Sequence, residues 1–129
     1  MFAQITIIGN LGQNPELRHT PSGIPVCNFS VAVNRTWTDG NEEPQETVTW
    51  YRVKAWRRQA ESCHENLKKG SKVLIVSEII EVNPWIDGDG TPRATIEVTP
   101  RTVRFLSSRQ DNGEIPEGEP AHGDENPFF

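Results

Sequence analysis

The stretch Val48–Trp56 carries the residue types best suited to ligand chemistry in this chain, reading Val-Thr-Trp-Tyr-Arg-Val-Lys-Ala-Trp. Alternate side chains of a strand point to opposite faces, so two indoles and two cations are predicted to share one face. These four residues are Trp50, Arg52, Lys54 and Trp56. Aromatic rings interleaved with positive charge suit unpaired bases on a phosphate backbone. In the alternative, the indoles face the core and the cations reach past them to solvent.

No other group of residues predicts catalysis or metal binding. His64-Glu65 lacks the second histidine of a zinc-protease helix, and Cys27 and Cys63 lack the paired spacing of a zinc site. The segment Asp87-Gly88-Asp89-Gly90 begins like a calcium loop but has no glutamate at the twelfth position, so a hairpin turn is predicted. We therefore expect a protein that is not an enzyme and needs no metal and no cofactor.

Composition and charge indicate one domain followed by an acidic tail. The 129 residues have 34% hydrophobic content, with ten prolines and ten glycines, which suits a strand-rich domain with many turns. The net charge of −5 lies entirely in the tail, because residues up to Leu106 are neutral overall while six acids and one arginine follow from Ser107. Two cysteines make no disulfide framework, and no apolar run could span a membrane, so a cytoplasmic protein with reduced thiols is expected.

The periodicity predicts five strands and one short helix. The strands are expected near residues 3–10, 26–35, 48–56, 72–82 and 94–105, with an edge or a break at Pro100. Ala60, Cys63 and Leu67 follow a helical spacing within residues 58–69. Gly9 and Gly12 are expected to mark a bulge or bend in the first strand. This order predicts an all-β, five-stranded oligonucleotide-binding (OB) barrel over residues 1–106, with the helix between the third and fourth strands. Residues 107–129 are predicted to form a disordered acidic tail.

Several segments resemble the bacterial single-stranded DNA-binding protein (SSB) family. The resemblance is carried, in order over roughly residues 3–106, by residues 8–18, 35–39, 50–53, 67–73 and 85–87. It implies that Trp37, Trp50, Trp56 and Trp85 stack on bases, and that Arg18, Arg52, Arg58 and Lys69 are the basic positions of the site. The stretch Ile79–Pro84 departs from relatives, which usually have a basic segment there. Fewer phosphate contacts and a shallower salt dependence are therefore expected.

The resemblance also implies assembly and partners. It suggests a homotetramer that binds single-stranded DNA in replication, recombination and repair, with Tyr51 at a subunit contact; ordinary core packing is the alternative for this tyrosine. It suggests a nucleoid-associated location and a tail tip that docks on genome-maintenance proteins. The tip residues are Asp124, Glu125, Asn126, Pro127, Phe128 and Phe129. An interaction module like the primosomal relatives remains a second hypothesis, whereas an OB-domain enzyme lacks catalytic residues.

Overall fold

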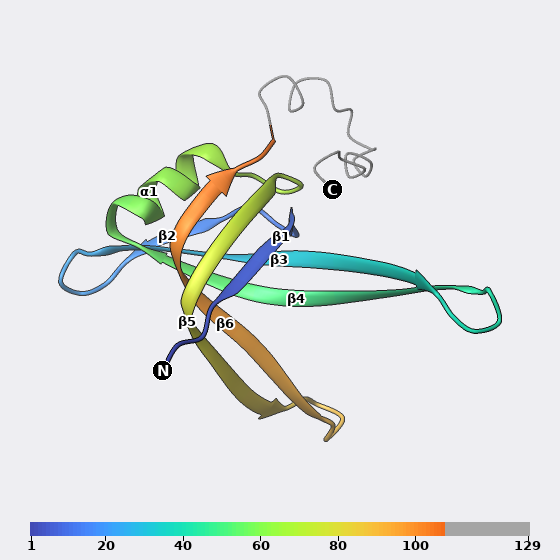
Figure 1. Cartoon of the computed structure of the whole chain (residues 1–129). Coiled ribbons are helices and arrows are strands. Elements are labelled where there is room, and N and C mark those ends of the chain that lie inside the picture. Colours follow the sequence, from blue (N-terminus) through green and yellow to red (C-terminus); the bar gives the residue numbers. More distant parts are fainter. Residues whose placement is uncertain (108–129) are drawn as a thin grey trace.

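The computed structural model describes residues 1–107, which form six strands and one helix (Figure 1). The elements are β1 Ile5–Leu11, β2 Glu16–His19, β3 Pro25–Thr38, β4 Pro44–Trp56, α1 Arg57–Asn66, β5 Lys72–Ile86 and β6 Pro92–Phe105. The predicted tail from residue 108 onward, including its docking tip, lies outside the described residues. Within residues 1–107 no helix is long and apolar enough to cross a membrane.

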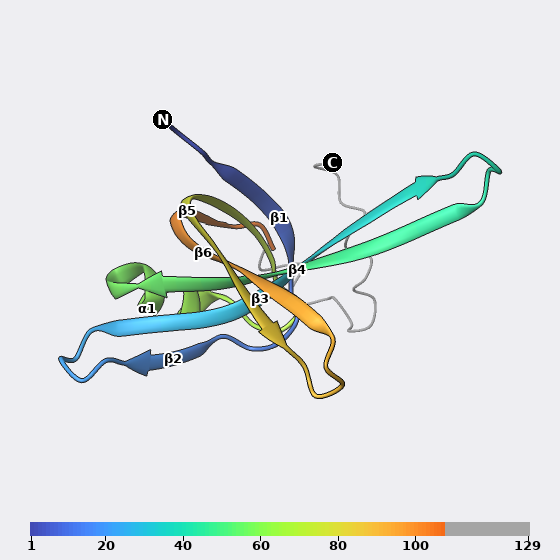
Figure 2. The ribbon, with the colours of Figure 1, turned by 90° about the horizontal axis from the view of Figure 1, so that it is seen from below.

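Five of the strands close into a barrel, which confirms the predicted OB architecture. The order is β1-β5-β6-β4-β3, and β1 returns to β3 through the pairs Asn10↔Ala32 and Leu11↔Val31. The strand β2 was not predicted; it is short, pairs only with β3 and runs beside it outside the ring (Figure 2). The helix predicted between the third and fourth barrel strands therefore lies between β4 and β5.

Gly9 permits this closure. A Cβ at this position would clash with the backbone carbonyl oxygen of Ala32 and would lie 2.8 Å from Cγ1 of Val31. Only glycine allows β1 to approach β3 so closely. The predicted bend at Gly9 thus corresponds to the seam of the barrel.

The core is formed by the inward-facing residues, which alternate along each barrel strand, and by one face of α1. Phe29, Val31, Val53, Ile75 and Val98 are buried inside the ring. From α1, Ala60 and Cys63 pack against the same core. Such alternation is the pattern expected when one face of each strand packs inward and the other faces solvent.

The helix ends earlier than predicted. It stops at Asn66, because Leu67 is extended and buried and the chain then turns at Gly70, where φ is +90°. The Gly70 N–H donates to the Leu11 carbonyl at 2.9 Å, which ties this turn to the end of β1. Lys68 and Lys69 therefore lie in a loop next to the barrel mouth and not in the last turn of the helix.

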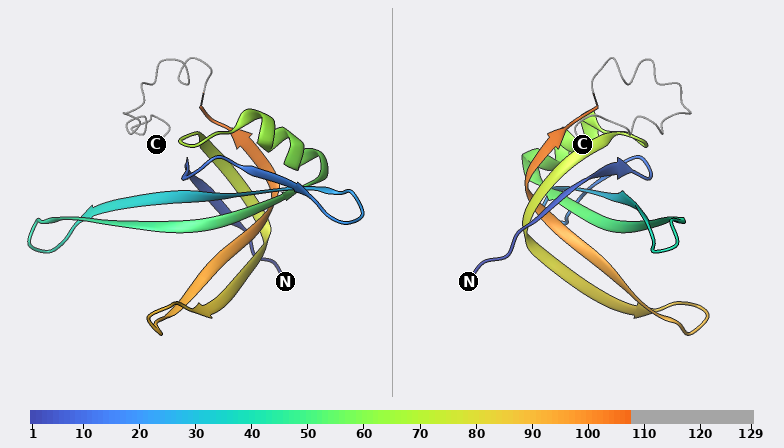
Figure 3. Two further views of the ribbon diagram at one scale, coloured as in Figure 1. Left: turned by 180° about the vertical axis from the view of Figure 1, so that it is seen from behind. Right: turned by 45° about the vertical axis from the view of Figure 1, so that its right-hand side comes forward.

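The hairpins β3–β4 and β5–β6 both extend beyond the barrel (Figure 3). Their strands were predicted to end at Arg35 and Val82, but pairing continues to Thr38↔Pro44 and Ile86↔Pro92. We call residues 79–99 the β5–β6 arm. The predicted hairpin turn at Asp87 is confirmed: its carboxylate accepts hydrogen bonds from the Asp89 and Thr91 N–H groups and from Arg93. The Arg93 hydrogen bond lowers the pKa of Asp87 most.

Pro100 lies at an irregularity within a continuous strand. The β5–β6 register shifts between Val76 and Ser77 and again between Ser77 and Ile79, so Glu78 and Arg101 are left out of the pairing. These two residues form an ion pair, with Arg101 Nη1 at 2.9 Å from Glu78 Oε2. The buried Ser77 hydroxyl donates to the carbonyls of Ile79 and Thr99. A proline without an N–H fits at such a bulge, so the edge or break predicted at Pro100 corresponds to this local irregularity.

Candidate nucleic-acid interface

The outward residues of β4 present the predicted row of indoles and cations. Trp50 is 53% exposed and Trp56 36% exposed, while the intervening Val53 and Ala55 are fully buried. Arg52 is exposed and Lys54 half-exposed. The alternation therefore faces this row to solvent, and the alternative in which the indoles fill the core is wrong.

This surface continues across β6 onto β5. Arg52 pairs with Glu97 in the parallel β4–β6 ladder, and Glu97 pairs with Glu81 in the antiparallel β6–β5 ladder. Because paired residues share a face and the period is two, Asn83 and Trp85 lie on that face as well. Its members, which we call the outer face, are Trp50, Arg52, Lys54, Trp56, Glu97, Glu81, Asn83 and Trp85. The Trp85 ring is 49% exposed, and its Nε1–H donates to Thr95 Oγ1 at 3.1 Å.

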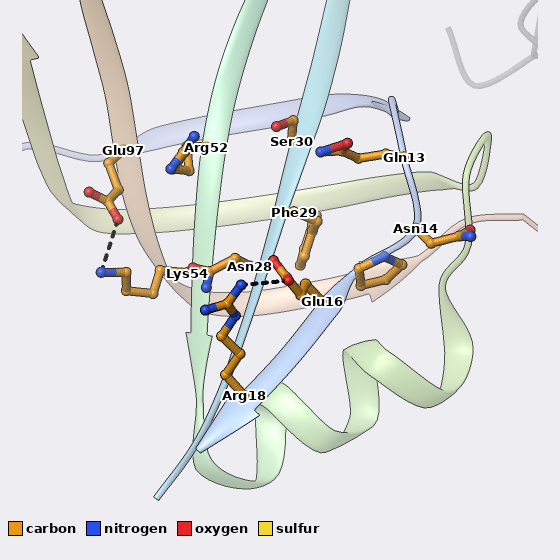
Figure 4. Close-up of a pocket in the computed structure, with 11 residues that line it drawn as sticks. Gln13, Asn14, Glu16, Arg18, Asn28, Phe29, Ser30, Arg52, Lys54 and Glu97 are labelled. Carbon is orange, nitrogen blue, oxygen red and sulfur yellow. Dashed lines mark hydrogen bonds and ion pairs between the residues drawn. The ribbon is translucent and has the colours of Figure 1, made fainter. Parts of the chain in front are cut away.

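A cleft of about 690 Å³ lies over the middle of the outer face (Figure 4). It is lined from β2, β3, β4 and β6 and from the loop after β1. Its charged groups are three cations and two carboxylates: Arg18, Arg52, Lys54, Glu16 and Glu97. A groove with a positive excess and neighbouring aromatic rings suits a single nucleic-acid strand.

Two of the cleft cations are already paired with carboxylates. Arg18 Nη2 lies 2.8 Å from Glu16 Oε2, and this hydrogen bond raises the pKa of Arg18. Lys54 Nζ lies 3.3 Å from Glu97 Oε2. Among residues 1–107, no carboxylate forms an ion pair with Arg52. Arg52 is therefore the cleft cation whose charge is most available to a phosphate.

Gly12 belongs to the interface although no sequence pattern indicated why. A Cβ at Gly12 would lie 2.6 Å from both Cη2 and Cζ3 of Trp50, so the indole lies directly against this glycine. The predicted bend at Gly12 thus makes room for the Trp50 ring. A long-range contact of this kind leaves no local signal in the sequence.

Lys69 is held near the cleft through the loop that follows β1. Its backbone N–H donates to Asn14 Oδ1 at 2.8 Å, and Asn14 lines the cleft. The Asn10 amide donates to the Gly70 carbonyl at 3.1 Å in the same place. The loop after α1 is therefore tied to β1 and to the loop that follows it, and the Lys69 backbone lies next to the cleft residue Asn14.

Two predicted site residues lie apart from this group. Trp37 pairs with Gln45 in the part of the β3–β4 hairpin that extends beyond the barrel. Its register places it on the opposite face of this hairpin from Trp50. The Arg35 guanidinium lies 5.7 Å from the centre of the Trp37 ring, within the range of a cation–π contact. Arg58 lies on α1 beside a separate groove with Cys63, Val103 and Phe105. Of the four tryptophans for which the resemblance implies stacking, three lie on the outer face and Trp37 does not.

The described part of the chain offers stacking surfaces and charges and no reactive centre. Within it, no three side chains of the metal-binding types come together. Burial raises the pKa of Cys27 to about 11 and that of Cys63 to about 12, so both thiols are protonated at neutral pH and are poor nucleophiles. This geometry can hold a ligand that carries flat rings on a negatively charged backbone.

The fold and this surface define an OB-fold protein of the nucleic-acid-binding class. The sequence profile of the Single-strand binding protein family matches residues 2–106, and the chain belongs to that family. Members of this family are non-enzymatic DNA-binding proteins, which confirms the expectation that the chain is not an enzyme.

Named relatives show the same kinship. The chain is 44% identical over 111 residues to Single-stranded DNA-binding protein 2 of Chlorobaculum tepidum, covering 85% of this chain and 74% of that protein. It is 36% identical over 124 residues to Single-stranded DNA-binding protein 1 of Xylella fastidiosa, covering 94% and 88%. The match to Single-stranded DNA-binding protein of Neisseria meningitidis is 34% over 109 residues and covers 84% of this chain and 62% of that protein.

A solved structure shares the fold. The Plasmodium falciparum SSB in complex with ssDNA superposes with a TM-score of 0.68 at 24% sequence identity. The match covers 80% of this chain and 93% of that chain. At this identity the likeness concerns the barrel itself.

Proposed function

We propose that this protein binds single-stranded DNA without sequence preference, by stacking bases on indoles and by contacting phosphates with cations of the outer face. The observation that carries the proposal is the continuous outer face, on which Trp50, Trp56 and Trp85 are all exposed. Stacking tolerates any base, because every base has a π-face. The proposed contact residues are Arg18, Trp37, Trp50, Arg52, Lys54, Trp56, Arg58, Lys69 and Trp85. Trp37 and Arg58 would contact the DNA only where the DNA extends beyond the outer face.

Titration of tryptophan fluorescence with oligo-dT tests this proposal. Binding of oligo-dT should quench the tryptophan emission. Trp50→Ala and Trp56→Ala should each weaken DNA binding by about 1–3 kcal/mol, a figure general to single-strand binders of this family. Phe2→Ala is the matched control, since Phe2 is an exposed ring that precedes β1 and does not line the cleft. If both tryptophan variants bind like the control, the outer face is not the binding surface and the interaction-module hypothesis gains.

We further propose that the chain assembles with copies of itself into a homotetramer. The side of the β5–β6 arm opposite the outer face is apolar along its length. This apolar face comprises Ile80, Val82, Pro84, Ile86, Pro92, Ala94 and Ile96. Val82 is 61% and Ile86 68% exposed in the single chain. Such a stripe costs free energy in water unless something covers it, and a second apolar face of the same kind would do so.

Tyr51 lies where this apolar face meets the barrel. It pairs with Ile96 in the β4–β6 ladder, packs against the core and is half-buried. A tyrosine at such a junction keeps its ring in apolar surroundings and its hydroxyl at an edge, as at many interfaces. Sedimentation or light scattering should give about four times the 14.5 kDa chain mass. A monomer at micromolar concentration would remove the proposal.

Finally, we propose a role in cytoplasmic DNA replication, recombination and repair, with partner enzymes recruited through Asp124–Phe129. This segment combines two acids with two phenylalanines, which suits a pocket with an apolar floor and a basic rim. Pull-downs should compare the full chain with a variant in which Phe128 and Phe129 are replaced by alanine. Loss of captured proteins with unchanged DNA affinity supports docking, and identical captured sets would refute it.

A further inference from the structure

Glu97 occupies the middle of the outer face, between the β4 cations and Trp85. Its Oε2 lies 3.3 Å from Lys54 Nζ, and its Oε1 accepts from the Asn83 amide at 3.4 Å. The Glu97 side chain is only 15% exposed, whereas that of Lys54 is 38% exposed. The carboxylate is therefore held from two sides, beneath the path that a strand over the outer face would follow.

The other ion pair of the cleft is different in kind. Arg18 and Glu16 are 67% and 58% exposed, so water can replace either partner and the pair is easily opened. Glu97 has little access to water. Removing its lysine partner without a substitute would leave a shielded negative charge poorly compensated.

A second carboxylate strengthens the negative character of this part of the outer face. Glu81 is the direct cross-strand partner of Glu97, so the two acids stand side by side beyond Lys54. A phosphate that approached Lys54 would meet two cations, Lys54 and Arg52, and two carboxylates, so the acids cancel the positive charge at this point. Like charges placed directly opposite each other on a sheet repel, and an added phosphate would increase that repulsion.

We propose that Glu97 is an internal competitor for Lys54: it takes the place that a DNA phosphate would otherwise occupy and so reduces the number of phosphates that the outer face neutralises. This inference rests on the single-stranded DNA binding proposed above. In the parent protein, Arg52 contacts phosphate without a competing carboxylate, whereas Lys54 does so only in competition with Glu97. Near Lys54 and Glu97 the DNA strand is held by the indoles on either side.

The substitution Glu97→Gln tests the inference, because it keeps the size and the hydrogen-bonding oxygen but removes the charge. Lys54 then gains a phosphate contact, and the plot of log affinity against log salt should steepen by about 0.7. At about 50 mM salt the variant should bind oligo-dT about eightfold more tightly than the parent, and the two should converge near 1 M. Glu78→Gln is the matched control, since this carboxylate pairs with Arg101 and does not line the cleft.

Lys54→Gln supplies the second measurement. In the Glu97→Gln background it should abolish the gain, and in the parent background it should lower the salt slope by much less than the roughly 0.7 of a full phosphate contact, because Glu97 competes with the phosphate for Lys54. A slope that falls by about 0.7 for Lys54→Gln alone would show that Lys54 already makes a full phosphate contact, and would overturn the inference even if Glu97→Gln fails to fold. If the Glu97→Gln variant folds but shows the same salt slope as the parent protein, the inference is overturned as well. Failure of the parent itself to bind DNA would instead refute the proposed function.

Discussion

Replacing Gly12 with alanine would test whether the Trp50 ring must lie against the loop after β1. The added Cβ would stand 2.6 Å from two ring carbons, whereas ordinary contacts begin at 3.4 Å. The ring must therefore retreat by at least 0.8 Å or rotate away. The substitution displaces the Trp50 ring from the side of the loop after β1 and removes no atom from the outer face.

The free energy of unfolding should change little, because Trp50 is 53% exposed and can swing outward without opening the core. Alanine also restricts the unfolded chain, which offsets part of any strain by about 0.4–1 kcal/mol. DNA affinity should respond more strongly. If the ring loses its stacking position, the loss approaches that of Trp50→Ala, about 1–3 kcal/mol or about 5- to 150-fold in Kd.

The assay is fluorescence titration with oligo-dT, alongside chemical denaturation of each variant. Gly40→Ala is the matched control, since a Cβ there has nothing within 4 Å and the backbone is not left-handed. The Gly12 effect should disappear in a Trp50→Ala background, because the two changes act through one ring. Binding of Gly12→Ala equal to that of Gly40→Ala, with Trp50→Ala impaired, would refute the role of the ring position.

Further predictions concern the barrel seam, the thiols and the arm. Gly9→Ala should destabilise the fold toward the upper end of roughly 1–3 kcal/mol, measured by denaturation, because its Cβ meets backbone that cannot move aside. Stability should fall as pH rises above about 9: unfolded thiols ionise near 9.0, while Cys27 and Cys63 keep their protons to about 11 and 12. Replacing both cysteines with alanine should reduce that alkaline loss in pH-dependent melts. Val82→Asp should dissociate the assembly in sedimentation without unfolding the chain, because Val82 is 61% exposed. In the Glu97→Gln background, where no carboxylate stands opposite it, Glu81→Arg should steepen the salt slope of DNA binding by about a further 0.7, and an unchanged slope there would place the arm away from DNA.

The barrel and the indole row could be predicted because burial on one face imposes a period of two. Val53 and Ala55 are fully buried between exposed neighbours, which is the pattern that Val48–Trp56 shows in the sequence. The face of α1 was predictable for the same reason, since Ala60 and Cys63 repeat at helical spacing.

Elements without a buried face could not be predicted in this way. The strand β2 has no fully buried residue and exists through its pairing with β3. The outer parts of both hairpins are exposed on both sides, so no alternation marked their length. Their paired backbone, and not side-chain burial, extends them.

Features that depend on register between distant strands were also beyond local pattern. The contact of Lys54 with Glu97 requires the parallel pairing of β4 with β6, more than forty residues later. The face of Trp37 depends on how residues 39–43 join β3 to β4. The support of Trp50 by Gly12 joins two segments that are adjacent only in the folded barrel.

The bulge at the base of the β5–β6 arm limits how the arm can change length in evolution. Glu78 and Arg101 each add one unpaired residue, so their offsets cancel and the arm keeps one apolar and one polar side. An insertion of one residue in both strands between the bulge and Trp85 would preserve pairing but would exchange the two sides, so that Trp85 would lie on the apolar side and Ile86 on the outer face. Only steps of two residues per strand keep both sides in place. Length variants of this hairpin that still function should therefore differ by multiples of four residues, or carry a new bulge that restores the phase.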